Sequence, residues 1–279
     1  MQFQHFGSIF YNQGLLFWLG LAVIPLLTPI NWLFEAMKWN TLTRHIQDHS
    51  MKDSYHSVLA GIAFGFVTPR AVGDYFGRML TFNHKNKPLV VVPLILGRVA
   101  QIIPTLFFGV IGILVISMQV NIQTLWYVIP AFLFFGSLIF LLGFNGLKKY
   151  LYSLMQHLGW LEAKTNGLKL RDILHVIKLS FLRYVVFSSQ FLIAMIVFGV
   201  EANFFIMMAG ITWIFFAKSI IPSFSFLSDL GIREFSAILF FEAFQVPLVP
   251  VLAASLFIWL INIAIPSIIG LLSVQRAKI

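Results

Sequence analysis

The chain has 279 residues, of which 59% are apolar and only 10% charged, with a mean hydropathy of +0.89. Soluble globular domains carry about 25% charged residues, so this composition excludes that class and indicates a membrane protein. The net charge is +9, which basic cytoplasmic loops explain better than a nucleic-acid-binding face, so no nucleic-acid partner is expected. The chain has no cysteine, which excludes disulfides and thiol catalysis.

Long apolar runs predict the elements that cross the membrane. A bilayer is spanned by about 20 apolar helical residues, and the runs lack the alternation expected of barrel strands. The predicted fold class is therefore all-α, a polytopic transmembrane helix bundle. Six runs are long enough to cross, and they lie at residues 15–34, 89–118, 126–145, 179–200, 203–222 and 248–272.

Two shorter apolar pieces, residues 57–69 and 234–246, are bounded by Pro, Gly and charged residues. Because both are too short to cross comfortably, we interpret them as re-entrant or broken helices. The positions of Lys and Arg place the N-terminus outside and the C-terminus inside, with the basic loops in the cytoplasm. With this topology the segment 57–82 enters the membrane and returns, whereas the piece 234–246 crosses.

We expect one transmembrane domain over residues 1–279, with halves at roughly 1–146 and 179–279 that a cytoplasmic segment, 147–178, joins. Five apolar residues in that segment recur at helical spacing, and they are Tyr150, Leu151, Leu154, Met155 and Leu158. This pattern predicts either a helix on the inner leaflet or a loop helix packed on the bundle.

A first polar cluster lies directly after the apolar piece 57–69. Arg70, Asp74 and Arg78 are spaced four residues apart and share one face of a helix, so that two cations flank one carboxylate. Charged groups at membrane depth are costly and are functional candidates by default. Pro69 favours a helix start here, and the free backbone N–H groups of that start add positive potential. The cluster therefore has the chemistry to hold a phosphate group.

A second polar cluster, Asp229, Arg233 and Glu234, follows Pro222 at the start of the short apolar piece 234–246. The same order of Pro, Gly and charge in both halves suggests structural repeats, and transporters built from repeats place their site between broken helices. We therefore expect the two clusters to form one substrate-binding cavity that opens toward the cytoplasm. The alternative is that both are helix caps and ion pairs that orient re-entrant segments.

Further polar residues in or near the apolar runs are candidates for lining the same cavity. They are Glu35, Lys38, Arg98, Arg183, Lys218, Glu242 and Asn262. Six of them have a structural alternative. Glu35 and Lys38 could form a membrane-boundary ion pair, the three basic residues Arg98, Arg183 and Lys218 could snorkel to the inner headgroups, and Asn262 could serve helix packing.

An enzyme has little support in the sequence. Four potential metal ligands fall on one face of a predicted helix, and they are His45, His49, Asp53 and His56. Neighbouring basic residues, Arg44 and Lys52, would repel a cation, so no metal site is expected. No HExxH, P-loop, GxSxG or dinucleotide motif occurs, so we expect neither a cofactor nor an enzymatic activity.

Four stretches of the chain carry a resemblance to a known family. They are Asn31-Trp32-Leu33-Phe34-Glu35-Ala36-Met37-Lys38-Trp39; Ala60-Gly61 with Thr68-Pro69, Gly73-Asp74 and Gly77-Arg78; Leu230-Gly231-Ile232-Arg233-Glu234; and Trp259-Leu260-Ile261-Asn262 with Pro266 and Gly270. From about Asn31 to Gln275 the chain resembles the lysylphosphatidylglycerol synthase transmembrane (flippase-like) family of bacterial and archaeal membrane proteins.

The resemblance implies a multi-helix inner-membrane domain, which in larger members is associated with moving a modified phospholipid between leaflets. The sequence departs from that pattern in two ways. It contains no C-terminal aminoacyltransferase domain, and we expect that it lacks one leading membrane span that many relatives have. Lipid aminoacylation is therefore not expected.

The leading functional hypothesis is a flippase-like protein of the inner (plasma) membrane that binds or translocates an anionic phospholipid or lipid-linked intermediate. Surplus cations match a phosphate, and the 31 Phe residues suit acyl or prenyl chains. Because no ATP motif is present, movement would be passive or coupled to an ion gradient. Candidate proton carriers are Asp74, Asp229, Glu234 and Glu242.

The alternative hypothesis is a non-transporting accessory or scaffold protein of envelope lipid or polysaccharide biosynthesis. The expected partners are anionic membrane lipids, together with an envelope-biosynthesis protein or a second copy of the chain.

Overall fold

The computed structural model describes residues 14–68, 70–118, 168–221 and 226–276, and these residues form helices without any strand. Four helical elements are long and apolar enough to cross a membrane. They are α2 (Leu15–Thr43), α5 (Val91–Ser117), α9 (Leu170–Val197) and the continuous run of α12 (Leu248–Trp259), the π-helical η4 (Leu260–Ala264) and α13 (Ile265–Arg276). The prediction of an all-α transmembrane bundle is confirmed. The predicted span 126–145 and the amphipathic residues 150–158 lie outside the described residues.

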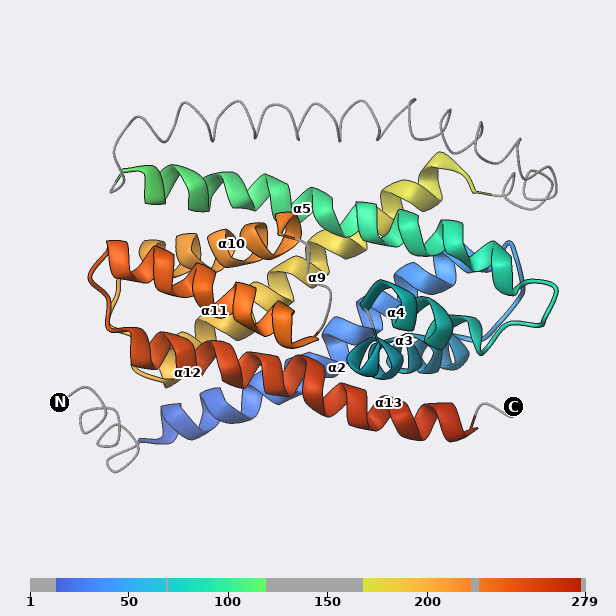
Figure 1. Cartoon of the computed structure of the whole chain (residues 1–279), viewed down its shortest axis with the longest axis horizontal. Helices are drawn as coiled ribbons and strands as arrows, with labels where there is room; N and C mark the ends of the chain where they lie inside the picture. The colour runs from blue at the N-terminus through green and yellow to red at the C-terminus, as the bar shows by residue number, and fades with distance from the viewer. Residues whose placement is uncertain (1–13, 69, 119–167, 222–225, 277–279) are drawn as a thin grey trace.

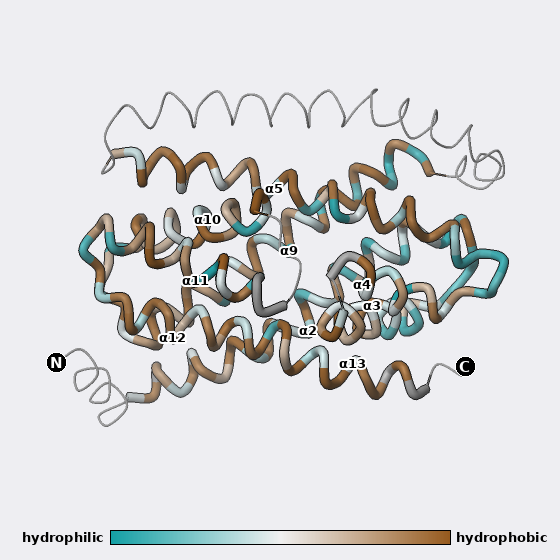
Figure 2. Tube along the Cα trace, in the orientation of Figure 1, coloured by the Kyte–Doolittle hydropathy of each residue, from teal (hydrophilic) through white to brown (hydrophobic). Residues whose placement is uncertain are grey.

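The long helices run along the long axis of the molecule (Figure 1). α2 packs against α9, and α5 packs against α9 and α10. Figure 2 shows that hydrophobic residues dominate these helices, while hydrophilic residues gather at the end that holds the α4–α5 connection. Many outward side chains are large and apolar, among them Leu26, Phe107 and Ile196. Such a surface suits lipid, and the helices satisfy their own backbone groups there.

Between α2 and α5 the chain forms a hairpin of two short helices, α3 (Met51–Val67) and α4 (Arg70–Met79), which pack closely on each other. A capping box starts α3: Ser50 Oγ accepts from the Asp53 backbone N–H at 3.2 Å, and Asp53 Oδ2 accepts from the Ser50 N–H at 3.0 Å. The hairpin enters from the end of the molecule where α2 ends and α5 begins, and it returns there (Figure 1). The segment 57–82 therefore forms a hairpin, which is the geometry that the predicted re-entrant segment requires.

A second hairpin lies between α9 and α12 and consists of α10 (Phe204–Ile220) and α11 (Phe226–Ala243). α10 begins and α11 ends at the opposite end of the molecule, and the end of α10 and the start of α11 lie near its middle (Figure 1). The 17 residues of α10 reach about 26 Å, less than the roughly 30 Å of a hydrocarbon core. Neither α10 nor α11 is among the four candidate membrane spans of the described residues, and α10 packs on α11, so the structure favours a re-entrant pair over the predicted crossings of 203–222 and 234–246.

The two halves have the same order of elements: a long helix, a re-entrant hairpin and a second long helix. The hairpins point toward each other from opposite ends (Figure 1), so the halves have opposite directions. This arrangement is the one expected of inverted structural repeats.

The end of α2 and the start of α9 differ from the predicted boundaries, and charged residues form ion pairs at this place. α2 continues nine residues past residue 34, and α9 begins nine residues before residue 179. Asp172 in the first turn of α9 pairs with Arg44, and its Oδ2 lies 3.6 Å from His45 Nε2. The predicted single helix face over residues 45–56 is also wrong, since α2 ends at Thr43 and α3 starts anew at Met51.

Polar contacts fasten α2 to α9 along their length. Besides the Asp172 contacts at one end, Gln190 Nε2 donates to the Ile24 carbonyl at 2.8 Å and to Thr28 Oγ1 at 3.0 Å toward the other end. Near the middle, Arg183 Nε donates to Asn31 Oδ1 at 2.7 Å. These two helices therefore form one connected pair.

Glycines allow the first hairpin to pack directly on its neighbours. A Cβ at Gly77 of α4 would lie 2.3 Å from the Ala60 carbonyl oxygen of α3. A Cβ at Gly270 of α13 would lie 2.2 Å from the Leu59 carbonyl oxygen. Both distances are shorter than any van der Waals contact, so the backbones approach only because side chains are absent.

Replacing Gly77 or Gly270 with Ala is expected to lower the free energy of unfolding by about 1–3 kcal/mol, because the helices have to separate. Chemical unfolding of the purified protein in detergent measures this change. Gly231→Ala on α11 is the matched control, since its Cβ would meet nothing within 4 Å. Equal stability of the three variants would contradict the close packing.

Candidate functional site

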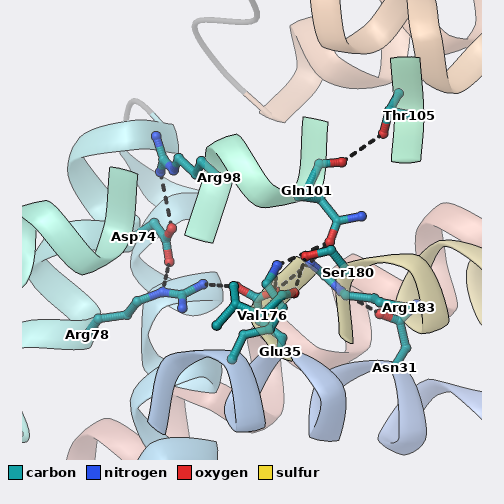
Figure 3. A network of polar contacts seen from close by, with 11 residues as sticks. Asn31, Glu35, Asp74, Arg78, Arg98, Gln101, Thr105, Val176, Ser180 and Arg183 are labelled. Atoms are coloured by element: carbon teal, nitrogen blue, oxygen red, sulfur yellow. Dashed lines mark hydrogen bonds and ion pairs between the residues drawn. The ribbon is translucent and has the colours of Figure 1, made fainter. Parts of the chain in front are cut away.

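The centre of the polar site is the carboxylate of Glu35 on α2, whose residue is only 7% exposed (Figure 3). Its Oε2 accepts from Lys38 Nζ at 3.1 Å and from Arg183 Nη1 at 2.7 Å. Its Oε1 accepts from Arg78 Nη2 at 3.0 Å. One buried carboxylate thus joins cations from α2, α4 and α9.

A second carboxylate, Asp74 on α4, extends this network toward α5. Arg78 Nε donates to Asp74 Oδ1 at 2.6 Å, and Arg98 Nη2 donates to Asp74 Oδ2 at 3.1 Å (Figure 3). Gly61 of α3 makes room for this pair, because a Cβ there would lie 2.4 Å from Asp74 Oδ1. The spacing of Asp74 and Arg78 by one helical turn therefore produces the ion pair expected from the sequence.

Two indole rings of α2 hold the arginines in place. The Arg78 guanidinium carbon lies 5.0 Å from the Trp39 ring centroid, and that of Arg183 lies 5.0 Å from the Trp32 ring centroid. Trp32, Glu35 and Trp39 follow one another at spacings of three and four, so they share a helix face. Cation–π contacts of this kind gain strength away from water.

The network borders a first cavity of about 390 Å³. The charged residues that line it are Glu35, Lys38, Asp74, Arg78, Arg98 and Arg183. Four cations face two carboxylates, so two positive charges remain without an acidic counterpart in the lining. A dianionic phosphate is the kind of ligand that would balance them.

The first cavity lies near half-length of the long helices. Gln101 of α5, Arg183 of α9 and Ile263 of η4 all line it, and each is close to the middle of its helix. The first hairpin adds Gly61, Gly65 and the charged residues of α4. The site therefore sits deep between the two halves rather than at a helix end.

The second polar cluster lies beside a separate cavity of about 260 Å³. Asp229 of α11 is 1% exposed, and its Oδ2 lies 3.0 Å from Nζ of Lys218, which lines this second cavity from α10. Arg233 Nη2 donates to Glu234 Oε1 at 3.2 Å. Asp229, Arg233 and Glu234 border neither of these two cavities, and the ion pair of Asp229 with Lys218 connects the second cluster to the lining of the second cavity.

The other predicted site residues fall in three places. Arg70 is the first residue of α4, and its side chain lies outside what the structure describes. Asn262 of η4 lines the second cavity and donates to the Ile258 carbonyl at 3.3 Å. Glu242 is exposed near the end of α11, about 12 Å of helix beyond Glu234, and it borders neither cavity. The binding roles of these residues and the opening toward the cytoplasm stay predictions.

Sequence reasoning missed Gln101, which lines both cavities. Its Oε1 accepts from Lys38 Nζ at 3.2 Å. An amide in the middle of the apolar run 89–118 was the available signal, because polar side chains at membrane depth are costly.

Two of the four residues considered as metal ligands, His49 and Asp53, contact nearby groups of the chain. His49 contacts Thr43 Oγ1 through Nε2 at 3.1 Å and the Gln47 carbonyl through Nδ1 at 2.7 Å, and Asp53 caps α3. In the described parts of the chain no group of three His, Asp or Glu side chains could hold a metal ion.

Comparison with protein families gives one match. The family described as "Lysylphosphatidylglycerol synthase TM region" matches residues 1–270. The chain belongs to this family. The resemblance to the lysylphosphatidylglycerol synthase transmembrane family is thereby confirmed, and the long apolar helices make the chain a multi-pass member of it. Neither the curated proteins nor the solved structures include a match.

Glu35→Gln is expected to lower the free energy of unfolding by about 3 kcal/mol or more, because buried cations lose their shared carboxylate. Chemical unfolding in detergent again provides the measurement. Glu242→Gln, at an exposed position, is the control and should stay within about 0.5 kcal/mol of the original protein. An unchanged stability of Glu35→Gln would show that the bundle does not depend on this carboxylate.

Proposed function

We propose that the protein binds an anionic phospholipid or lipid-linked intermediate in the first cavity and moves it between the leaflets of the membrane. The observation that carries this proposal is the cavity near half-length of the long helices, with its two surplus positive charges. A phosphate entering the membrane loses its hydration, and only such charges offset that loss.

The chemistry of the arginines supports a phosphate as the ligand. Guanidinium groups bind phosphate oxygens through pairs of parallel hydrogen bonds. Arg98 is the most exposed charged side chain of the network at 42%, so it is available to a ligand entering the cavity. Arg78 and Arg183 are already oriented by Glu35 and by the indole rings, which lowers the ordering cost of binding.

The two opposed hairpins support movement as well as binding. In transporters built from inverted repeats, the site lies between the repeats and opposite motions expose it to one side at a time. Here α4 borders the first cavity and α10 borders the second, so each hairpin forms a wall of the site. The lipid is moved without being altered chemically, either down its own gradient or with an ion gradient. Of the four candidate proton carriers named from the sequence, Asp74 is the one that lines the first cavity.

The proposal includes an orientation in the inner membrane. The α4–α5 connection carries Lys85 and Lys87, whereas the α9–α10 connection carries no basic residue. Cytoplasmic loops are enriched in Lys and Arg, so the first hairpin enters from the cytoplasm and the second from outside.

Arg78→Ala and Arg183→Ala are each expected to slow translocation of a fluorescent anionic phospholipid in proteoliposomes by roughly 10–100-fold, since each removes hydrogen bonds to a charged group. Arg171→Ala is the matched control because Arg171 is exposed on the first turn of α9, away from both cavities. The control should translocate lipid like the original protein.

Equal translocation by all of these proteins would overturn the site. If, in addition, the original protein moves no lipid but retains a co-purified envelope protein, the accessory-protein hypothesis takes the place of transport.

Single cysteines test the orientation, and the cysteine-free chain is a ready background. His84→Cys lies in the α4–α5 connection and Glu201→Cys in the α9–α10 connection. In intact cells a membrane-impermeant maleimide should label position 201 and leave position 84 unlabelled until the cells are opened. The reverse pattern would overturn the orientation and leave the site unaffected.

A further inference from the structure

A separate group of buried polar side chains lies where α2, α9 and η4 meet. The side chains are those of Thr28, Gln190 and Asn262, which are 7%, 0% and 2% exposed. Gln190 Nε2 donates to Thr28 Oγ1 at 3.0 Å, and Thr28 Oγ1 lies 3.5 Å from Asn262 Oδ1. None of the three side chains carries a charge, so this group differs in chemistry from the network around Glu35.

The hydrogen-bond donors of this group already have partners. The Gln190 amide gives its two hydrogens to the Ile24 carbonyl and to Thr28 Oγ1, and the Asn262 amide donates to the Ile258 carbonyl at 3.3 Å. The single hydroxyl hydrogen of Thr28 has two acceptors, the Ile24 carbonyl and Asn262 Oδ1, each 3.5 Å away. This distance is at the outer limit of a hydrogen bond, so neither contact is strong.

The acceptors, in contrast, exceed the donors. Gln190 Oε1 is buried and has no hydrogen-bond partner among the described residues. The reverse orientation of this amide is disfavoured, because it would set two oxygens, that of the amide and that of the Ile24 carbonyl, against each other. Asn262 Oδ1 has the long contact with Thr28 as its printed-sequence neighbour on α2. Buried acceptors without a good donor cost free energy, so these oxygens favour an additional positive partner.

The π-helical turn adds a backbone oxygen beside Asn262. The Ile265 N–H donates to the Leu260 carbonyl, five residues back, and Pro266 has no N–H. The Ile261 carbonyl is thereby left without the two donors that an α-helix or a π-helix would supply. π-helical turns are frequent at functional sites, and in transporters built from repeats the freed carbonyls of interrupted helices coordinate Na⁺.

The chemistry of these oxygens favours a monovalent metal cation as the positive partner. Amide, hydroxyl and carbonyl oxygens are hard ligands, but divalent cations are bound mainly with the help of carboxylates. In the described part of the chain no Asp or Glu hydrogen-bonds to Thr28, Gln190 or Asn262. A proton is not suited to the site either, because none of these side chains titrates. A buried water molecule is the alternative occupant, since it donates two hydrogens.

The position of the group suits an ion that acts together with the first cavity. Thr28 is the middle residue of α2, and Asn262 lies near the middle of the continuous helix of α12, η4 and α13. On α2, Thr28 is seven residues, about 10 Å of helix, from Glu35 at the first cavity. On α9, Gln190 is equally far from Arg183. Opposite charges attract over about 10 Å where little water separates them, so a cation here and a phosphate in the first cavity would strengthen each other's binding.

From these observations we infer that Thr28, Gln190 and Asn262, together with the Ile261 carbonyl, bind a monovalent alkali cation such as Na⁺ between α2, α9 and η4. The cation site stands on these contacts alone. Its role as the ion that couples to lipid movement rests on the proposed function.

Thermal unfolding of the purified full chain in detergent tests the site, with NaCl or KCl compared with choline chloride at equal ionic strength. A cation that binds only the folded state raises the unfolding midpoint, by roughly 5 °C when its concentration is about a hundredfold above its dissociation constant. Equal midpoints in the three salts would overturn the inference and would agree with a buried water molecule instead.

Thr28→Val removes one oxygen of the site and is expected to lose the midpoint shift. Thr212→Val is the matched control and should keep it, because Thr212 is also buried and its hydroxyl donates to the Ala209 carbonyl of its own helix at 2.9 Å. A shift that persists unchanged in Thr28→Val would contradict the assignment of the site.

Asn262→Asp tests the site in the opposite direction. A carboxylate in place of the amide is expected to bind Na⁺ roughly tenfold more tightly, whereas the midpoint in choline chloride should fall because the buried charge lacks a cation. A merely structural Asn262 would not produce a gain in Na⁺ affinity, so an unchanged affinity counts against the inference.

Arg78→Ala separates the cation site from the proposed function. It should slow lipid translocation and keep the midpoint shift, since Arg78 hydrogen-bonds to acidic residues of the first cavity. If Arg78→Ala translocates lipid like the original protein while the shift is present, the proposed function is wrong and the cation site stands. If translocation by the original protein is the same in NaCl and in choline chloride, the coupling role is wrong.

Discussion

A carboxylate deep among apolar helices is stable only if cations surround it, and Glu35 has three, from Lys38, Arg78 and Arg183. Each cation would itself be costly without Glu35, so the four groups require one another. Because they belong to α2, α4 and α9, this requirement fixes the first hairpin against the long helices. The cavity, its surplus charge and the stacking on Trp32 and Trp39 all follow from that arrangement.

The sequence predicts those parts of the structure that depend on local spacing. Apolar length predicts the bundle, and Asp74 and Arg78 are one helical turn apart, so their ion pair follows directly. The contacts of Glu35 with Arg78 and Arg183 join residues 43 and 148 positions apart, which no local pattern encodes. The apolar run 203–222 is as long as a span, but only 17 of its residues form a helix, α10, and this helix packs on α5 and α11.

The two cavities divide the chemistry of the site between the halves of the chain. The first hairpin contributes charge through α4, while α10 contributes aromatic and hydroxyl groups beside a single lysine. The long helices contribute the residues that both cavities share, above all Arg183 and Gln101.

The fastening of α2 to α9 has a mechanical consequence. Asp172, Arg183 and Gln190 of α9 contact α2 or the residue that follows it, near both ends and in the middle. These contacts make the two helices one stiff unit. Deformation would then concentrate in the π-helical η4, where the regular hydrogen-bond ladder is already interrupted. The continuous helix of α12, η4 and α13 would thus bend at the depth of the cavities, while the pair of α2 and α9 keeps its shape.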